Sequence, residues 1–287
     1  MITIPEYSKI YQAVQNFLLT KYTEPDTVSS LLPSEMAVGC DLARYQYTFT
    51  PAIATGKIDF AIQKATEGTT ITDSQYDVIW NGLKDVAIRG AYHYQRSGQS
   101  WQAQADFFLN TASRHDYHFH CLDMEGAGNT YSDTFFADTK RIIDYWRLQY
   151  PNKRAALYTN ISTYDLMYNS LIRQYGTGVK AWLDNLDFWI AYPATAGTPR
   201  MSVNRTTGSQ GKTWNLHQYS WTGSPSRWGT GGTAVDENVF NGTVADMKAW
   251  AGVIVAPPST LPPVDVTVNI TAQGYQPLTL TGTQLPS

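Results

Sequence analysis

The sequence contains only two cysteines, Cys40 and Cys121, in 287 residues. Two cysteines cannot build the disulfide framework of a small secreted domain. Side chains in a strand alternate between its two faces. If Asp41 and Asp123 face the same side of their strands, Cys40 faces away from that side and Cys121 faces with it. We therefore expect no bridge between the two thiols, and both are interpreted as small core side chains.

The chain also lacks a long apolar run and a basic segment. No stretch approaches the ~20 consecutive apolar residues that a helix needs to span a bilayer. The formal net charge is -3, and no lysine- or arginine-rich run is available to displace counterions from nucleic acid. Hydrophobic residues make up 43% of the chain and charged residues 16%. This composition argues against a membrane span and a nucleic-acid partner, and it allows one large barrel domain or two smaller domains.

Eight short apolar segments have the length and composition of buried strands. Helical spacing of apolar residues separates several of them, and strand–helix alternation implies parallel strands with crossover helices. The later strands lack good helices between them, so the predicted fold is α/β, an irregular TIM-like (β/α) barrel with eight strands and fewer than eight helices. The expected strands are 38–45, 58–68, 89–95, 118–126, 154–160, 187–193, 214–220 and 235–240, and the expected helices are 74–87, 100–114, 133–150 and 162–175.

Segments outside these elements complete the predicted organisation. Residues 176–186 and 194–213 are rich in Gly, Thr and Asn and are expected to be long loops that shape a binding site. The tail after residue 252 combines a proline-rich linker with the alternating segment VDVTVNIT, which is either the start of a small β module or a strand docking on the barrel. The predicted parts are thus 1–36, an N-terminal extension, 37–252, the barrel, and 253–287, a linker and β-like tail.

The N-terminal extension lacks the pattern of a signal peptide, which needs a basic start, an unbroken apolar run and a small-residue cleavage site. Ile10, Val14, Phe17 and Leu18 instead fall at helical spacing. We expect an amphipathic helix that either docks on another molecule or caps the bottom of the barrel. We therefore expect either export by another route or a native leader that lies outside this chain.

The segment HFHCLDMEGAG (residues 118–128) places two carboxylates, Asp123 and Glu125, on one face at the end of a strand. Repulsion between like charges costs free energy, so the arrangement indicates a function. Two residues along a strand rise about 6.6 Å, and the two carboxyl groups can come within ~5–6 Å, as in retaining glycosidases. Crowded carboxylates cannot all ionise easily, so one of them can keep a proton and act as an acid.

Other polar residues are expected at the same mouth, because function in parallel barrels lies at the carboxyl ends of the strands. Asp41 belongs to the first strand, Lys64 to the second, Gln218 to the seventh and Asp236 to the eighth. Four carboxylates around one mouth suit acid–base chemistry. Nine Trp and 19 Tyr supply flat rings that stack on sugars, although such rings also fill cores.

The chain resembles glycoside hydrolase family 25, the Chalaropsis-type lysozymes of bacteria and phages. The resemblance covers about residues 37–252 and rests on eight motifs in the family's order: GCDLARYQ, FAIQKATEG, GAYHY, LDMEG, ALYTN, FWIAYP, HQYS and VDENVFNG. It implies hydrolysis of the β-1,4 bond between N-acetylmuramic acid and N-acetylglucosamine in peptidoglycan. The reaction would proceed with retention and without a metal or cofactor.

The resemblance also implies roles for individual residues. Glu125 matches the general acid/base, and Asp123 matches its partner, either a nucleophile or a group assisting the substrate's N-acetyl group. Asp41 and Asp236 match flanking acids that orient the sugar. Positions that match the lining of the groove are Tyr92, Tyr158, Trp189, Tyr192 and Gln218. Lys64 either tunes the carboxylates or neutralises the mouth.

Three histidines require separate interpretation. His217 stands where the family usually has tryptophan, and regular alternation would point it away from the mouth, opposite to Gln218. His118 and His120 resemble a metal-binding pair. Their parity is opposite to that of the carboxylate pair, so they are expected to face the helices and no metal site is predicted.

Two alternatives remain beside an active muramidase. A chitinase-type hydrolase requires Asp-x-x-Asp-x-Asp-x-Glu, and Cys121 and His118 occupy two of its aspartate positions. A glycan-binding or virion structural module on the same fold would have no use for carboxylates that repel each other. The expected partner is bacterial cell-wall peptidoglycan, with the terminal extensions as candidate contacts to a phage virion or to the wall.

Overall fold

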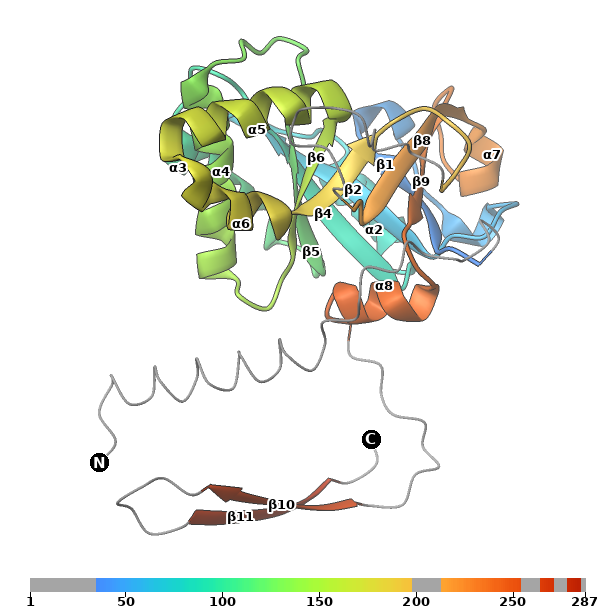
Figure 1. Ribbon diagram of the computed structural model, residues 1–287. Helices are drawn as coiled ribbons and strands as arrows, with labels where there is room; N and C mark the ends of the chain where they lie inside the picture. The colour runs from blue at the N-terminus through green and yellow to red at the C-terminus, as the bar shows by residue number, and fades with distance from the viewer. Residues whose placement is uncertain (1–34, 198–212, 254–263, 271–277, 285–287) are drawn as a thin grey trace.

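The computed structural model describes residues 35–197 and 213–253 in full and the backbone of strands 264–270 and 278–284. Its main body is a closed barrel partly surrounded by helices (Figure 1). The elements in chain order are β1 (Val38–Leu42), η1 (Arg44–Gln46), η2 (Pro51–Ile53), β2 (Phe60–Glu67), β3 (Ile71–Thr72), α2 (Tyr76–Leu83), β4 (Ile88–Tyr94), α3 (Trp101–Ala112), β5 (Phe119–Asp123), α4 (Asp133–Gln149), β6 (Ala155–Asn160), α5 (Ile161–Tyr175), η3 (Thr177–Val179), α6 (Lys180–Asp184), β7 (Asp187–Ala191), β8 (Leu216–Gly223), α7 (Pro225–Trp228), β9 (Val235–Phe240) and α8 (Val244–Trp250).

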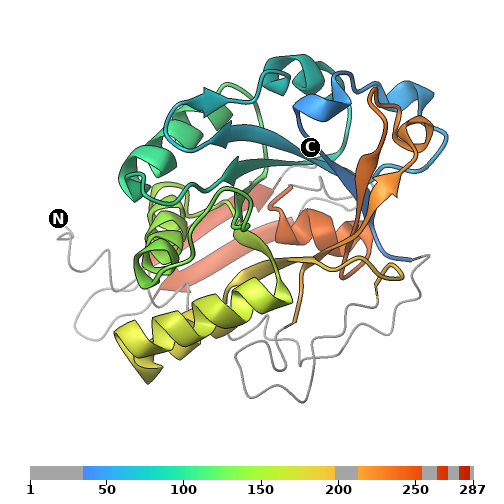
Figure 2. The same cartoon turned by 90° about the horizontal axis from the view of Figure 1, so that it is seen from above.

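Eight of these strands close on themselves in the order β1-β9-β8-β7-β6-β5-β4-β2, with β1 pairing β2 and the short β3 added at the edge of β2. The predicted irregular barrel is confirmed. The long helices α3, α4 and α5 cover one side, whereas the described helices next to β8 and β9, α7 and α8, are short (Figures 1 and 2). The helical cover is therefore incomplete in the second half of the chain, as expected.

One of the eight barrel strands is not parallel to its neighbours, although the prediction assumed parallel strands throughout the barrel. β9 runs antiparallel to both of its neighbours, β1 and β8. The other neighbouring barrel strands pair in parallel, in the order β1, β2, β4, β5, β6, β7 and β8. The amino end of β9 therefore lies at the same mouth as the carboxyl ends of the other strands. The expectation that Asp236 stands at the carboxyl end of its strand is wrong, since it is the second residue of β9.

Two apolar layers hold the barrel together. One lies inside it and includes Phe60, Ile62, Phe119 and Cys121. The other lies between the strands and the helices and includes Cys40 together with many helix residues. Both cysteines are buried and free, and they occupy different layers. The predicted absence of a bridge is confirmed, and alternation along β1 and β5 is the reason.

The helices follow local signals in the sequence. In α4, Ser132 accepts a hydrogen bond from the backbone N–H of Phe135 and so caps the first turn. Asp133 in that turn complements the helix dipole. The helix ends two residues before Pro151, because a proline disfavours helical backbone in the residue before it.

Residues 176–186, expected to be a loop, instead form η3 and α6. Val179, Leu183 and Leu186 are buried at helical spacing within this segment, and that apolar stripe explains the short helix. Gly176, with φ 69°, ends α5. The fourth expected strand also stops at Asp123 rather than continuing to residue 126.

Within the C-terminal tail, the structure describes the backbone of two strands. β10 (Val264–Ile270) and β11 (Leu278–Gln284) pair with each other, antiparallel, in a two-stranded sheet of their own. The predicted N-terminal helix, the proline-rich linker and most of the expected loop 194–213 lie outside the described residues. Among the residues that are described, no helix is both long and apolar enough to cross a bilayer.

The two histidines before the carboxylate pair face outward from the barrel, as predicted. His118 accepts a hydrogen bond at Nδ1 from the backbone N–H of Arg89. His120 is buried against aromatic rings of α3 and α4, with its ring centroid 5.7 Å from that of Phe108 and 5.6 Å from that of Trp146. Neither nitrogen of His120 has a hydrogen-bond partner among the described residues, and burial lowers the pKa of His120 to about 3.

We expect His120→Phe to increase the free energy of unfolding by about 1–3 kcal/mol, because an apolar ring replaces a buried polar group without partners. The gain should be larger at pH 4.5 than at pH 7. Between the folded pKa and the unfolded value of about 6.5 only the unfolded histidine binds a proton, so the wild type loses stability as pH falls through this window. Urea denaturation at both pH values measures the effect.

His93→Phe is the matched comparison. His93 is equally buried, but its Nδ1 lies 2.8 Å from Thr66 Oγ1 and its Nε2 3.3 Å from Gln104 Oε1. Losing both contacts leaves polar partners unsatisfied, so this variant should be destabilised. A His120→Phe protein no more stable than the wild type at either pH would contradict the prediction.

Candidate active site

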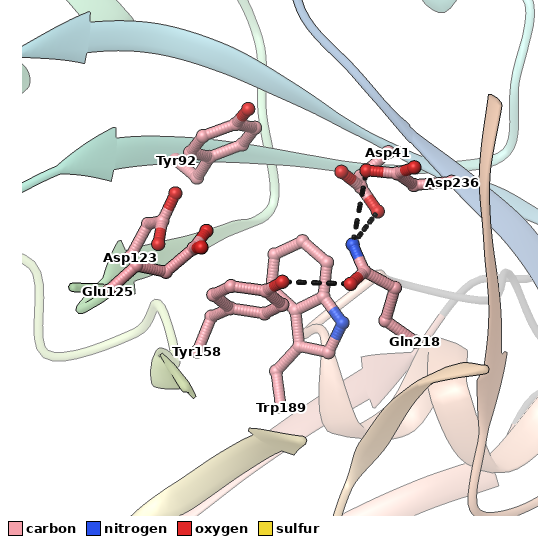
Figure 3. Close-up of a pocket in the computed structure, with 8 residues that line it drawn as sticks. All are labelled: Asp41, Tyr92, Asp123, Glu125, Tyr158, Trp189, Gln218 and Asp236. Carbon is pink, nitrogen blue, oxygen red and sulfur yellow. Dashed lines mark hydrogen bonds between the residues drawn. The ribbon is translucent and has the colours of Figure 1, made fainter. Parts of the chain in front are cut away.

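A small cavity of about 60 Å³ opens at the mouth of the barrel. Its lining combines four carboxylic acids with three aromatic rings and one amide, all of them residues predicted from the sequence (Figure 3). They are Asp41, Tyr92, Asp123, Glu125, Tyr158, Trp189, Gln218 and Asp236. Of the predicted site residues, only Lys64 and Tyr192 are absent from this lining.

Asp123 and Glu125 lie side by side on one wall of the cavity (Figure 3). β5 ends at Asp123, but alternation of the side chains continues for two more residues. Met124 between them is fully buried on the helix side, where its sulfur accepts a hydrogen bond from Thr139 Oγ1. Its backbone N–H donates to the carbonyl of Tyr158 on the neighbouring strand at 2.9 Å. Because the alternation continues, the side chain of Glu125 lies at the mouth of the barrel, on the same side as Asp123.

Asp123 is 5% exposed, and its Oδ1 has no hydrogen-bond partner among the described residues. Burial is the largest cause that raises the pKa of Asp123 well above its ordinary value, and the adjacent Glu125 carboxyl group raises it further. Lys64 opposes this effect. Asp123 is thus protonated more readily than an exposed aspartate would be.

Asp41 and Asp236 form a second acidic pair on the opposite side of the cavity (Figure 3). They are direct partners in the register of β1 and β9. Burial is the main cause that raises the pKa of Asp236 to about 6, with Glu125 as a second cause. The pKa of Asp41 is also raised, by burial and then by Asp236, while hydrogen bonds from Gln218 and Asn238 lower it.

Gln218 connects the two sides of the site. Its Nε2 donates to Asp41 Oδ2 at 2.9 Å and to Asp236 Oδ2 at 3.4 Å. Its Oε1 accepts from Tyr158 Oη at 2.8 Å and from Trp221 Nε1 at 2.8 Å. Because both acceptor bonds fix the amide oxygen, the two amide hydrogens must face the acids.

Asn238 was not identified from the sequence. Its Nδ2 donates to Asp41 Oδ2 at 2.7 Å, and its Oδ1 accepts from Trp189 Nε1 at 2.8 Å. It therefore connects the acidic pair to the tryptophan that forms part of the wall. The available signal was its position two residues after Asp236, which places both side chains on the same face of one strand.

Lys64 lies beside the site rather than in the cavity. Its Nζ is 2.7 Å from Glu67 Oε2 and 4.9 Å from the centre of the Tyr94 ring. Glu67 also accepts two hydrogen bonds from Arg96. The charge of Lys64 nevertheless opposes the rise in the pKa of Asp123, an effect that both roles predicted for this residue would have.

A larger groove of about 600 Å³ adjoins the small cavity and shares Glu125, Tyr158 and Asp236 with it. The remaining wall is mostly apolar and aromatic, and it includes the predicted Tyr192. The residues that complete the lining are Asn160, Ile161, Ser162, Ala191, Tyr192, Pro193 and Trp221. Sequence reasoning missed Trp221, which follows Gln218 by three residues.

His217 faces away from the mouth, as predicted. It is buried, its Nε2 lies 2.6 Å from the carbonyl oxygen of Tyr192, and its Nδ1 accepts from the backbone N–H of Gly197 at 3.3 Å. Burial lowers the pKa of His217 to about 4. This histidine supports the backbone behind the groove and does not enter it.

The site has the groups needed for acid–base and nucleophilic chemistry on a neutral, hydroxyl-rich substrate. A carboxyl pair shares one wall, a second pair shares the other, and aromatic rings lie between them. No group of three or more His, Cys, Asp or Glu side chains within the described ranges could hold a metal ion. Glycoside hydrolases use such a pair of carboxyl groups at a cavity.

Comparison with known proteins agrees with this interpretation. Lysozyme M1 of Streptomyces globisporus is 28% identical over 223 residues, which are 74% of this chain and 70% of that protein. The uncharacterized protein YegX of Escherichia coli K12 is 27% identical over 202 residues, 68% of this chain, and the match spans 63% of YegX. The chain thus covers less than two thirds of the length of that relative.

Similarity in structure extends over most of the barrel. A family 25 glycosyl hydrolase from Bacillus anthracis superposes with a TM-score of 0.57 at 20% identity, covering 79% of this chain and 99% of that structure. At this identity the likeness shows the fold. The sequence match is more specific, since residues 40–228, which carry all the acids of the site except Asp236, fit the pattern of glycosyl hydrolases family 25. The chain belongs to that family.

Proposed function

We propose that this protein is a lysozyme, an N-acetylmuramidase that cleaves the β-1,4 bond between N-acetylmuramic acid and N-acetylglucosamine in peptidoglycan. The observation that carries the proposal is the carboxyl pair of the buried Asp123 and the partly exposed Glu125 at the junction of the small cavity and the groove. Membership of the family and the similarity to Lysozyme M1 support it. The site of action would then be the bacterial cell wall.

Glu125 is the general acid in this mechanism. It is the member of the pair that lines both the small cavity and the larger groove, so its carboxyl group can reach a glycosidic oxygen that lies between them. It gives a proton to the departing sugar oxygen and then, as a base, removes one from the attacking water.

In its ionised form, with the acidic proton of the pair on Glu125, Asp123 supplies negative charge at the reacting carbon. It either bonds to that carbon or orients the substrate's own N-acetyl oxygen for attack, and both routes have two inverting steps. Asp41 and Asp236, held by Gln218, accept hydrogen bonds from the sugar. Tyr92, Tyr158 and Trp189 close the small cavity and exclude water, which strengthens each of these electrostatic contacts.

Digestion of purified peptidoglycan tests the reaction. After borohydride reduction of the products, we expect new reducing ends that derive from muramic acid. Reduced glucosamine ends would assign the opposite bond, and the absence of new ends would contradict an enzymatic function altogether. Binding to walls without cleavage would instead favour a glycan-binding module on this fold.

The same digestion, followed by proton NMR during the first turnovers, reports the stereochemistry. We expect β anomers to accumulate before mutarotation, because two successive inversions at the anomeric carbon retain its configuration. An α anomer formed first would rule out both two-step routes. The roles of the terminal extensions as phage or wall anchors remain predictions from the sequence.

A further inference from the structure

Trp221 differs from every other tryptophan of the chain. The protein has nine tryptophans, all within the described ranges, and eight of them are buried or partly buried. Trp221 is 51% exposed. An indole left half in water forgoes a large part of the free energy that burial would provide, so its exposure calls for an explanation other than core packing.

An irregularity in β8 places this ring at the mouth. Regular alternation would put Gln218 and Trp221, three residues apart, on opposite faces of the strand. The register of β8 with β9 shifts between Gln218 and Ser220, and such an extra residue reverses the alternation beyond it. Trp221 therefore returns to the side of Gln218, and its Nε1 donates to Gln218 Oε1 at 2.8 Å.

The hydrogen bond holds the only polar atom of the indole against the site while the ring borders the groove of about 600 Å³. The lining of this groove also includes Tyr192 and Pro193, and Asn160 and Ser162 add neutral polar groups. Among the described residues of its lining, the carboxylic acids are Glu125 and Asp236, and none is a lysine or arginine. A ligand with a carboxylate of its own would be repelled here.

On the basis of the proposed function, we propose that Trp221 is a stacking platform for an uncharged pyranose of the glycan strand, an N-acetylglucosamine unit. The apolar face of such a ring fits against an indole, and its hydroxyl and acetamido groups suit Asn160 and Ser162. N-acetylmuramic acid, whose lactyl group carries a carboxylate or a peptide, fits this acidic groove less well. The residue thus favours N-acetylglucosamine on the groove side of Glu125.

Binding can be measured without turnover by using the full chain with Glu125→Gln and titrating it with N-acetylchitotetraose, a glycan of uncharged units. Adding Trp221→Ala should weaken binding about tenfold, equivalent to ~1.4 kcal/mol. Adding Trp221→Phe should restore most of the affinity, because a phenyl ring keeps the stacking face and loses only the N–H. Tyr175→Ala, which removes an aromatic side chain 44% exposed on α5, should change nothing.

Each result has one meaning. Equal affinity with and without the Trp221→Ala change would overturn the platform while leaving the proposed hydrolysis intact. A Trp221→Phe protein as weak as Trp221→Ala would assign the effect to the bond with Gln218 instead. Failure of Glu125→Gln to bind any glycan, together with inactive wild type on peptidoglycan, would remove both proposals.

Discussion

Glu125→Gln should reduce the clearing of bacterial cell-wall suspensions by about 10⁴-fold, the upper range for loss of a general acid–base group. This corresponds to a barrier higher by ~5 kcal/mol. Glutamine has nearly the shape of glutamate but can neither give a proton to the leaving oxygen nor take one from water. Because Glu125 would serve in both steps, no other acid of the site can replace it fully.

The fold should survive the change. Glu125 lies beyond the end of β5, and its backbone carbonyl, which the substitution keeps, accepts from Asn129 Nδ2 at 2.8 Å. Turbidity loss over time measures activity, and thermal unfolding followed by circular dichroism checks the fold. Undiminished clearing by a folded Glu125→Gln protein would remove this residue from the mechanism.

Glu237→Gln is the matched control. Glu237 follows Asp236 on β9, but its side chain points out of the barrel, where its Oε1 accepts from Trp228 Nε1 at 3.1 Å. Glutamine keeps an oxygen that accepts this bond. The control should lyse walls at the wild-type rate, which would separate loss of the catalytic carboxyl group from a general effect of replacing a glutamate near the mouth.

Asp123→Asn should lower activity by about 10²- to 10³-fold, the usual cost of removing one electrostatic contact to a transition state. At the same time we expect it to increase the free energy of unfolding at pH 7 by about 1–3 kcal/mol. The reason is that Asp123 is buried with one oxygen lacking a partner, so the native state must either retain a proton there or bury a charge.

The pH dependence gives the sign of the stability effect. Burial and Glu125 raise the folded pKa of Asp123, so the native state binds more protons than the unfolded chain above the unfolded pKa of about 3.9. The contribution of Asp123 to the stability of the wild type is therefore fully present below the unfolded pKa and is lost as pH rises toward the folded pKa. The advantage of Asp123→Asn should grow over the same range, while activity stays low throughout.

Chemical denaturation between pH 4 and pH 8, alongside lysis assays, measures both effects. Asp187→Asn is the control, because Asp187 begins β7 at the opposite end of the barrel and accepts from Trp250 Nε1 at 2.9 Å. That variant should keep full activity and show no such gain in stability. An Asp123→Asn protein that is fully active, or less stable than the wild type at pH 7, would contradict the role assigned to this acid.

Local periodicity was enough to predict several orientations. Alternation along β5 correctly placed His120 toward the helices and Cys121 inside the barrel. The ordered motifs of the family identified all eight residues that line the small cavity. Neither inference needed contacts between distant parts of the chain, since each depends on neighbours in one strand or on similarity to known sequences.

Other features depended on contacts that no local pattern contains. The short helix α6 forms because its apolar residues find a surface to pack on, and the region had been interpreted as a loop from its composition. Asn238 was not identified because its role depends on Asp41 of the neighbouring strand β1, and Trp221 was not identified because its bond to Gln218, three residues earlier on β8, departs from strand alternation. In the case of Trp221, a bulge in β8 also reversed the expected alternation.

The sequence by itself determined the eight barrel strands, their inward and outward faces and the adjacency of Asp123 and Glu125. Side-chain alternation is a property of a single extended chain and needs no distant contact. Only the tertiary structure decided that β9 enters antiparallel between β1 and β8. That direction brings Asp236 beside Asp41 at the mouth, where Gln218 contacts both acids. Strand direction is set by closure of the whole barrel, which depends on hydrogen bonds between residues nearly two hundred positions apart.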